Sequence, residues 1–586
     1  MKNVLVYICL SVLCLSCKFT DKKVDNICTF TRVYGYVRWF YPSDEASQID
    51  WNKFAVYGVH KVENARNQKE LKEILLELFK PIAPAIQIAD KNQNINFDIK
   101  SITPIDTSGL STVFWMHMGV YLEHKSSMYS SLRYNRDTTG LIKAFANHYL
   151  MIGEFIKKDI GNSLVVIMPL ALYDNKKHTF PISDSLSLKQ LQLNLNQITN
   201  DELNSNNHTV KLANIVIAWN VIQHFFPYFD VVHVDWNEEL VRTLHSVYNG
   251  KNESDYFMTI SKMVAKLEDG HGVVFADKIE HWSLPFMVDL IQNKVVVTAS
   301  ADIKLFRKGD IIKSIDGKNA LKELKDQESL ISGSSQLKRF RALNMFGSDF
   351  TKSEAHIILI RSGKEIELET NRQTKCNLFF NPLFEDYKFE FIDLGEGLYY
   401  LNNYSDKEKG AMEKLVHAKG IIINDLANKS SMEFISHIIK EPVWCAKWNV
   451  PINTYPDRMK TFFDTGGRWS IQPKKPFIKA KLIFLTHPYD VSYGETLLGI
   501  LDNYKLGKFV GATSAATNGN VNFINLMGGY RIMWTGMKVL KHDGTQHHLI
   551  GFKPEYPVRR TIRAIKEGRD EYFEKAKEIL QEEVKR

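Results

Sequence analysis

Ser492 lies in a short segment whose residue types could support acyl transfer. The apolar run 482–485 is typical of a buried strand, the turn formers 486–490 follow, and 495–501 has the pattern of a helix. Ser492 is therefore expected at a strand-to-helix turn, where the helix N-terminus offers free N–H groups and a partial positive charge of about half a unit. Backbone donors around Tyr493 could then stabilise an oxyanion.

The same segment also fits a purely structural interpretation. A serine followed three residues later by glutamate, as in Ser492 and Glu495, is the pattern of a helix capping box. Taken alone, the segment favours the cap, because a serine hydroxyl needs a base before it can act as a nucleophile.

His271 is the candidate base. A serine–lysine dyad would need a lysine within residues 511–523, and that stretch has none. His271 stands in the turn Asp269–Gly272 after a predicted helix, and its flanking glycines predict an exposed side chain. A lone histidine is more often structural, so the pair carries weight only in combination. In that pairing Ser492 attacks a carbonyl while His271 takes its proton and returns it to the leaving group.

The elements that must position this pair begin with two helical units of similar sequence, residues 25–94 and 211–282. Each has an aromatic run that ends at a proline, followed by an Asp-Trp pair at equal spacing, Asp50-Trp51 in one and Asp235-Trp236 in the other. Each unit predicts an aromatic helix, a turn and a second helix, with the aromatic residues as packing core. Only the second unit ends in the turn that carries His271.

Turn-rich and apolar segments fill the rest of the chain. Residues 95–181 predict a small β-rich module, and 182–210 a Ser-, Asn- and Gln-rich linker. Within 283–374, the stretch 308–317 has a β-hairpin signal. In 385–586 strands and amphipathic helices alternate in an α/β pattern, and the chain closes in a charged helix. The expected strands are 397–401, 420–423, 482–485 and 509–511, and the expected last helix is 570–586. The fold class is multidomain α+β.

The motifs in this order resemble the S41 family of serine peptidases, from about Ala213 to the C-terminus. They are Asp269–Gly272, Ser492–Glu495, Val510–Ser514, Asn518–Asn520, Gly528–Tyr530, Asp543–Gly544, Gly551–Glu555 and Gly568–Asp570. The resemblance implies a ClpP/crotonase-like α/β catalytic domain over 385–586 and a PDZ-like domain over 283–374. Since the lysine is missing, it implies the tricorn-like Ser-His branch, with Tyr493 N–H as an oxyanion donor.

Two places depart from the family pattern. Residues 425–431, after a predicted strand, lack the glycines of the turn that supplies a second oxyanion donor, and side chains there restrict positive φ angles. Where the tricorn-like branch carries a glutamate, this chain has Gln546, followed by two histidines. Gln546 is thus the candidate third catalytic residue, although an amide cannot stabilise an imidazolium by charge.

The N-terminus resembles a bacterial lipoprotein signal over residues 1–17. A short positive start precedes the apolar run 4–15, which is too short to span a bilayer, and Cys17 follows a small residue. Cys14 stands where leucine is usual. Lipidation at Cys17 would anchor the protein in a bacterial membrane, facing the periplasm or the cell surface. Cleavage and simple secretion is the alternative.

The composition of the chain indicates which classes of partner and cofactor are not expected. The 586 residues are too many for one core, and the net charge of +8 is spread along the chain without a dense basic run. Nucleic-acid binding is therefore not expected. Cys28, Cys376 and Cys445 lack zinc-ligand spacing, and neither a metal nor another cofactor is expected.

Three functional hypotheses remain from the sequence. The first is an exported, lipid-anchored serine endopeptidase that hydrolyses extended polypeptides, with a peptide C-terminus held at the PDZ-like domain. The second is a catalytically inactive relative that binds peptides in the cell envelope, which the two departures support and the retention of His271 and Ser492 opposes. The third is an acyl-transfer enzyme that acts on esters.

Overall fold

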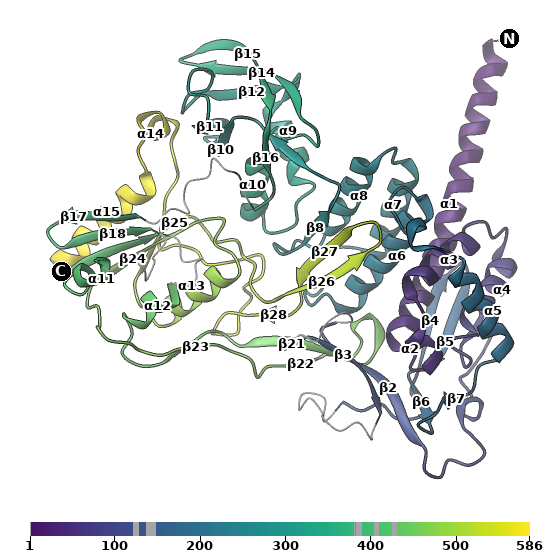
Figure 1. Cartoon of the computed structure of the whole chain (residues 1–586). Coiled ribbons are helices and arrows are strands. Elements are labelled where there is room, and N and C mark those ends of the chain that lie inside the picture. The colour runs from purple at the N-terminus through teal and green to yellow at the C-terminus, as the bar shows by residue number, and fades with distance from the viewer. Residues whose placement is uncertain are drawn as a thin grey trace.

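The chain folds into several helical and sheet layers, seen in a computed structural model (Figure 1). The structure describes residues 2–120, 128–135, 148–379, 381, 390–402, 410–424 and 431–586, with side chains described from residue 21 onward. Lipidation at Cys17 therefore concerns a side chain outside the described residues. Within the described part of the chain, no helix is long and apolar enough to cross a membrane.

The two similar helical units form a joint bundle. The first contains α1 (Lys2–Phe40), α2 (Asp44–Gln48), α3 (Trp51–Glu63) and α4 (Gln68–Phe79), and the second α6 (His208–Phe225), α7 (Trp236–Asn249) and α8 (Glu253–Ala265). The Asp-Trp pairs start α3 and α7, where Asp50 and Asp235 accept hydrogen bonds from backbone N–H groups of the first turn. Helices α1 and α6 approach closely, since a Cβ on Gly35 would lie 1.8 Å from Asn220 Oδ1. The repeat thus builds one core instead of two.

The segment expected as a linker is partly helical. Helix α5 (Ser185–Asn196) occupies its first half, capped by Asp184, and buries Leu191 and Leu195. Polar composition hid this helix because most of its surface faces solvent, with two leucines four residues apart making the packed face.

The β-rich module does not form a sheet of its own throughout, because four of its strands share a sheet with strands from the C-terminal half. Strands β2 (Ser111–Met118), β3 (Ser130–Asn135), β6 (Ala171–Asp174) and β7 (Thr179–Phe180) form a seven-stranded sheet with β21 (Trp448–Asn453), β22 (Phe462–Asp464) and β28 (Lys538–Val539). Strand β2 pairs antiparallel with β21, His117 opposite Asn453. Strands β1 (Gln87–Asp90), β4 (Phe155–Gly161) and β5 (Leu164–Pro169) form a second, three-stranded sheet.

A sheet with its own core follows the second helical unit. Its strands are β10 (Phe286–Ile291), β11 (Lys294–Ser300), β12 (Ile311–Ile315), β13 (Lys318–Asn319), β14 (Ser353–Arg361) and β15 (Lys364–Arg372), accompanied by α9 (Ala320–Glu328) and α10 (Ser335–Asn344). The hairpin expected within 308–317 is confirmed, since β12 pairs with β13 across the Asp316-Gly317 turn.

The predicted α/β region is a six-stranded sheet in the order β17–β18–β19–β24–β25–β29. The expected strands are confirmed as β18 (Leu398–Asn402), β19 (Gly420–Asn424), β24 (Lys481–Thr486) and β25 (Lys508–Gly511), and they run parallel to one another. Strand β17 (Glu390–Gly395) joins antiparallel, and β29 (Tyr556–Pro557) parallel.

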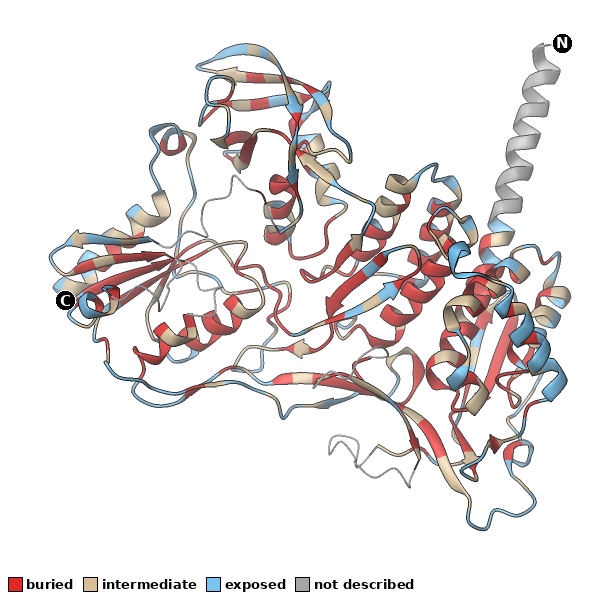
Figure 2. Cartoon of the chain, viewed as in Figure 1, coloured by how far each residue is buried: buried red, intermediate tan, exposed pale blue. Residues whose placement is uncertain are grey.

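Helices cover both faces of this sheet. Helix α15 (Glu571–Lys585), the predicted last helix, packs on one face, whereas α13 (Tyr493–Asn503) follows β24. The central strands β18, β19, β24 and β25 are mostly buried between them (Figure 2). Gly511 ends β25 so close to β24 that an added Cβ would lie 2.4 Å from Thr486 O, at a φ of 132° that favours glycine.

Candidate active site

Ser492 occupies a strained turn between β24 and α13, as the sequence predicted for its position. Its φ of 57° and ψ of −109° are rare for a residue with a side chain. Such backbone costs roughly 1–3 kcal/mol and persists only where neighbouring contacts impose it. Here Ser492 N–H donates to Thr517 O at 2.8 Å, and Ser492 O accepts from Thr496 N at 3.0 Å. The serine is held in a geometry typical of nucleophiles at sharp strand-to-helix turns.

The capping-box interpretation of this segment is wrong. The Ser492 hydroxyl makes no capping hydrogen bond, and its side chain stays partly accessible to solvent. Glu495 is fully buried and turns instead to the 514–517 loop, where it accepts from Ala516 N at 2.8 Å, from Thr517 N at 2.7 Å and from Ser514 Oγ. The glutamate thus fixes the loop that holds Ser492, and leaves the serine hydroxyl free.

Thr517 joins the two predicted catalytic segments. Its carbonyl accepts from Ser492 N–H, and its hydroxyl accepts from Gly270 N–H at 3.0 Å. The approach is close enough that a Cβ on Gly270 would lie 2.5 Å from Thr517 Oγ1. The turn before His271 and the turn with Ser492 therefore meet at one residue.

His271 is buried, contrary to the exposed position expected from its flanking glycines. The turn packs inward because Arg341, itself buried, donates to Gly270 O at 2.6 Å and Ser332 Oγ accepts from Asp269 N–H at 2.9 Å. Burial lowers the pKa of His271 below its usual value, with the charge of nearby Asp269 opposing that change. A neutral imidazole is the form that can accept a proton.

The orientation of the His271 ring is fixed by a chain of hydrogen bonds. Its Nδ1 lies 2.9 Å from Thr535 Oγ1, and Thr535 Oγ1 donates to Asp269 Oδ1 at 2.6 Å. Because the carboxylate can only accept, the threonine proton points to Asp269, so Thr535 accepts the proton of His271 Nδ1. This leaves Nε2 with the free lone pair, as a general base requires.

The Asp269 carboxylate is also held in place by several hydrogen bonds. Besides the threonine hydroxyl, it accepts from His271 N–H at 3.0 Å and from Thr535 N–H at 2.6 Å, and it is fully buried. Desolvation lowers the pKa of the buried Arg341 guanidinium to about 10, and the Asp269 charge opposes that shift. Three hydrogen-bond donors therefore hold the Asp269 side chain in one orientation.

Gln546 does not take the place of an acidic partner to His271. Its side-chain amide donates to His548 O at 2.8 Å, so it stabilises its own turn. His548 is buried and stacks on Tyr228 with 3.9 Å between ring centroids, and neither of its ring nitrogens has a hydrogen-bond partner among the described residues. Burial lowers the pKa of His548 to about 4, which keeps it neutral beside the site.

Tyr493, the candidate oxyanion donor, begins α13. Among the described residues its N–H has no hydrogen-bond acceptor, so it is available to a ligand at the N-terminus of an 11-residue helix. The other expected difference, the glycine-free turn 425–431, lies outside the described residues except for Ser431.

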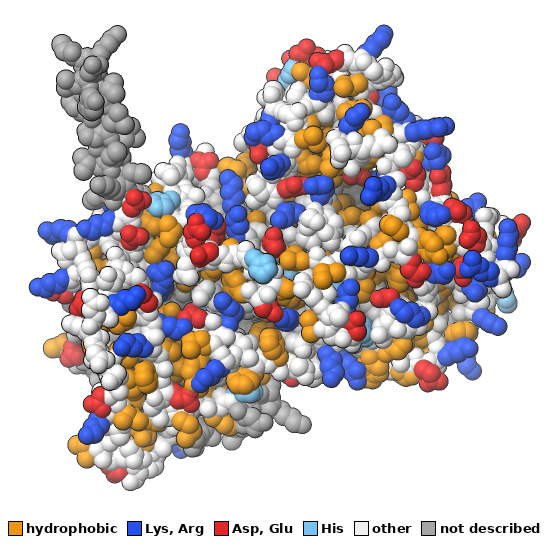
Figure 3. Space-filling view, turned by 180° about the vertical axis from the view of Figure 1, so that it is seen from behind, with side chains coloured by type: hydrophobic (Ala, Val, Ile, Leu, Met, Phe, Trp, Pro, Cys, Tyr) orange, Lys and Arg blue, Asp and Glu red, His pale blue; other side chains and the backbone are white. Residues whose placement is uncertain are grey.

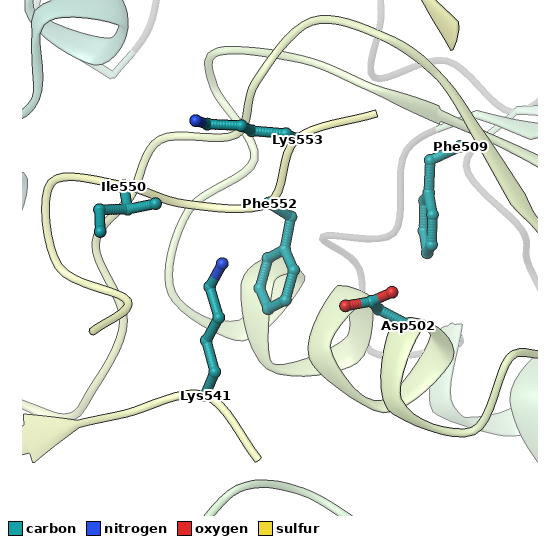
Figure 4. A pocket seen from close by; sticks show the side chains of 6 residues that line it. All are labelled: Asp502, Phe509, Lys541, Ile550, Phe552 and Lys553. Atoms are coloured by element: carbon teal, nitrogen blue, oxygen red, sulfur yellow. The ribbon is translucent and has the colours of Figure 1, made fainter. Parts of the chain in front are cut away.

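A cavity of about 230 Å³ lies beside α13 (Figure 4). Phe509, Ile550 and Phe552 provide apolar lining, and Asp502, Lys541 and Lys553 the charged groups. None of the predicted catalytic residues lines it. No group of acidic, histidine and cysteine side chains within the described residues could hold a metal ion.

Comparison with solved structures gives the fold an independent reference. Mature CPAF complexed with lactacystin matches with a TM-score of 0.51 at 12% identity, over 64% of this chain and 97% of that one. A mutant of CPAF matches with a TM-score of 0.52 at 13% identity, and the match covers 64% of this chain and 98% of the CPAF chain. The fold resembles that of CPAF.

A putative S41 protease from Bacteroides fragilis NCTC 9343 matches more distantly, with a TM-score of 0.32 at 11% identity over 62% of this chain and 94% of that one. No family model and no curated protein matches the chain. The comparisons thus show a fold like that of CPAF, and activity must be argued from the site.

The sequence located Ser492, His271 and Tyr493, but it missed the residues that connect them. Thr517 lies between two of the motifs and Thr535 outside them, and Asp269 was noted only as the start of the turn that carries His271. One signal was present: Asp269 lies two residues before His271, close enough for its carboxylate to bind the histidine backbone.

Proposed function

We propose that the protein is an S41-type serine endopeptidase that hydrolyses extended polypeptides through an acyl-enzyme on Ser492. The observation that carries the proposal is the relay from Asp269 through Thr535 to His271 Nδ1, which leaves Nε2 unprotonated in a turn tied by Thr517 to Ser492.

The chemistry follows from these positions. His271 Nε2 takes the proton from Ser492 Oγ as the oxygen attacks the scissile carbonyl. The relay then stabilises the imidazolium, because Asp269 places a negative charge beyond the threonine hydroxyl. The proton passes from Nε2 to the leaving amine, and water attacks the acyl-enzyme by the same route to release the second product and restore Ser492.

The oxyanion is stabilised by the start of α13. Tyr493 N–H and the partial positive charge of the helix N-terminus lie beside Ser492, and a single donor of this kind contributes about 10²–10³ in rate.

The finer domain assignments belong to the same proposal. The sheet of β10–β15 with α9 and α10 corresponds to the PDZ-like domain, and the parallel sheet with α13 and α15 to the ClpP/crotonase-like domain. A peptide C-terminus at the PDZ-like sheet would deliver the rest of the polypeptide to Ser492.

Ser492 is tested directly with a fluorophosphonate probe on the purified protein without residues 1–17, with adduct mapping by mass spectrometry. We expect labelling of Ser492, and its loss in His271→Ala and in Ser492→Ala. If the wild type fails to label while it remains folded and binds peptides, the protein is an inactive peptide-binding relative. Parallel assays with peptide and ester substrates separate an endopeptidase from an esterase.

A lipid anchor at Cys17 would place this activity at a bacterial membrane. The apolar run ending at Cys17 supports the proposal. Cells expressing the full chain should incorporate labelled palmitate into the protein and retain it in the membrane fraction. Cys17→Ala should abolish the label, and a wild type without label would refute lipidation.

A further inference from the structure

Aromatic rings form a connected cluster beside the proposed nucleophile. Tyr493 follows Ser492 directly, and its ring lies 5.8 Å from that of Trp469. The Trp469 ring in turn meets Trp448 edge-on, with 5.0 Å between centroids and 89° between planes. We call Trp448, Trp469 and Tyr493 the aromatic cluster.

The cluster is fixed in place although part of it faces solvent. Trp469 is 38% exposed, but its backbone is bound to Cys445 on both sides. The Trp469 N–H donates to Cys445 Sγ at 3.0 Å, and the Trp469 carbonyl accepts from Cys445 N–H at 3.0 Å. Trp448 is buried, and its N–H donates to Gly467 O at 3.0 Å. A half-exposed tryptophan held at the backbone and at its ring edge loses little conformational entropy when a ligand covers it.

The side chains of the cluster indicate an apolar occupant. None of the three carries a charge, whereas acidic and basic side chains are intermixed over the face of the molecule seen in Figure 3. Trp444, nearby on the same two-stranded ribbon of β20 (Val443–Trp444) and β23 (Ser470–Ile471), is 37% exposed but lies under the Arg468 guanidinium, 4.3 Å from its ring centroid. Trp444 thus already has a partner for its ring face, whereas Trp469 remains 38% exposed beside the ring of Tyr493, the residue that follows Ser492.

We infer that the aromatic cluster is a specificity subsite that receives a large apolar side chain, aromatic or aliphatic, of the polypeptide substrate within about two residues of the scissile bond. The inference rests on the proposed function, because the acyl group at Ser492 brings the flanking substrate residues to Tyr493. Edge-to-face packing against Trp469 favours an aromatic side chain over alanine at that position.

The test measures peptide binding in the Ser492→Ala background, so that it does not depend on turnover. Fluorescent peptides with phenylalanine or alanine, placed in turn at each position around a mapped cleavage site or scanned along an unbiased peptide, are titrated against the protein. We expect phenylalanine to bind more tightly at one position. Trp469→Ala should reduce that preference about three- to tenfold, and Trp469→Phe should restore most of it.

Trp444→Ala is the matched control, since it removes an equally exposed tryptophan from the same ribbon. It should leave the preference unchanged. The inference is overturned if no position prefers phenylalanine, if Trp469→Ala keeps the preference, or if Trp444→Ala reduces it equally. Failure of the proposed function has a different signature, namely absence of fluorophosphonate labelling in a wild type that still shows the binding preference.

Discussion

Thr535→Val removes one hydroxyl from the middle of the relay between His271 and Asp269 and nearly preserves the volume of a fully buried side chain. The bond of 2.6 Å to the carboxylate and the bond of 2.9 Å to His271 Nδ1 are both lost. The backbone bonds that hold Asp269 remain, so the carboxylate stays in place without a route to the ring.

The expected loss follows from these two bonds. A hydrogen bond to a charged group contributes about 1.5–3 kcal/mol and a neutral one about 1 kcal/mol. In the transition state His271 is an imidazolium, which makes both bonds matter more than in the ground state. A total of about 3–4 kcal/mol corresponds to a decrease of about 10²–10³ in the rate of Ser492 acylation. That is smaller than the roughly 10⁴ lost when a triad aspartate becomes asparagine, because Asp269 keeps its charge.

The assay is the second-order rate constant of fluorophosphonate labelling at Ser492, measured beside the thermal unfolding midpoint. Thr535→Ser keeps the hydroxyl and should label within a few fold of the wild type. The reasoning is refuted if Thr535→Val labels as fast as Thr535→Ser while both are folded. Equal damage in both variants would point to packing and not to the relay.

Further predictions concern the supports of the site and its response to pH. Gly270→Ala should slow labelling by about 10–10², since its Cβ would displace Thr517, whereas Gly410→Ala, with open space around it, should not. Glu495→Gln should lower the unfolding midpoint and the labelling rate together, because the 514–517 loop loses its buried anion. The labelling rate should rise with pH to a plateau with a midpoint below 6.5, because burial lowers the pKa of His271; a midpoint above 7 would contradict this. Burial also lowers the pKa of His117 to about 4, so between pH 6.5 and pH 4 the unfolded chain binds a proton that the folded chain does not. The free energy of unfolding, measured in urea titrations, should therefore fall as the pH is lowered from 6.5 to 4. A free energy that does not change over this range would contradict the prediction.

Much of the fold could be predicted from local pattern. The parallel strands are short apolar runs bounded by turn residues, and Asp50 and Asp235 mark helix starts, so both features are visible in the sequence. The pairing of β2 with β21 could not be predicted, because it joins segments more than three hundred positions apart. No local sequence pattern indicates which distant strand is the partner. Helix α5 was missed because its polar surface outweighed two buried leucines.

The candidate site was predictable as residue types and not as a network. Ser492 and Glu495 fit a capping box by spacing, but tertiary contacts to the 514–517 loop override that local arrangement. His271 was expected to be exposed because flanking glycines carry no bulk, yet the same lack of bulk lets Gly270 pack against Thr517. The relay through Thr535 depends on a strand brought to the turn by the fold, namely β27 (Tyr530–Thr535) beside β8 (Val273–Ala276).

The residues of the candidate site are far apart in the sequence, and this affects when the site can form during synthesis. A chain made from its N-terminus presents His271 long before Ser492, and Ser492 before Thr535. Strand β2 likewise pairs with β21 only when the C-terminal half has been made, and such non-local pairing slows folding. Under the proposed function, we expect the nascent protein to be inactive as a hydrolase during synthesis, and completion of the fold is the activation step.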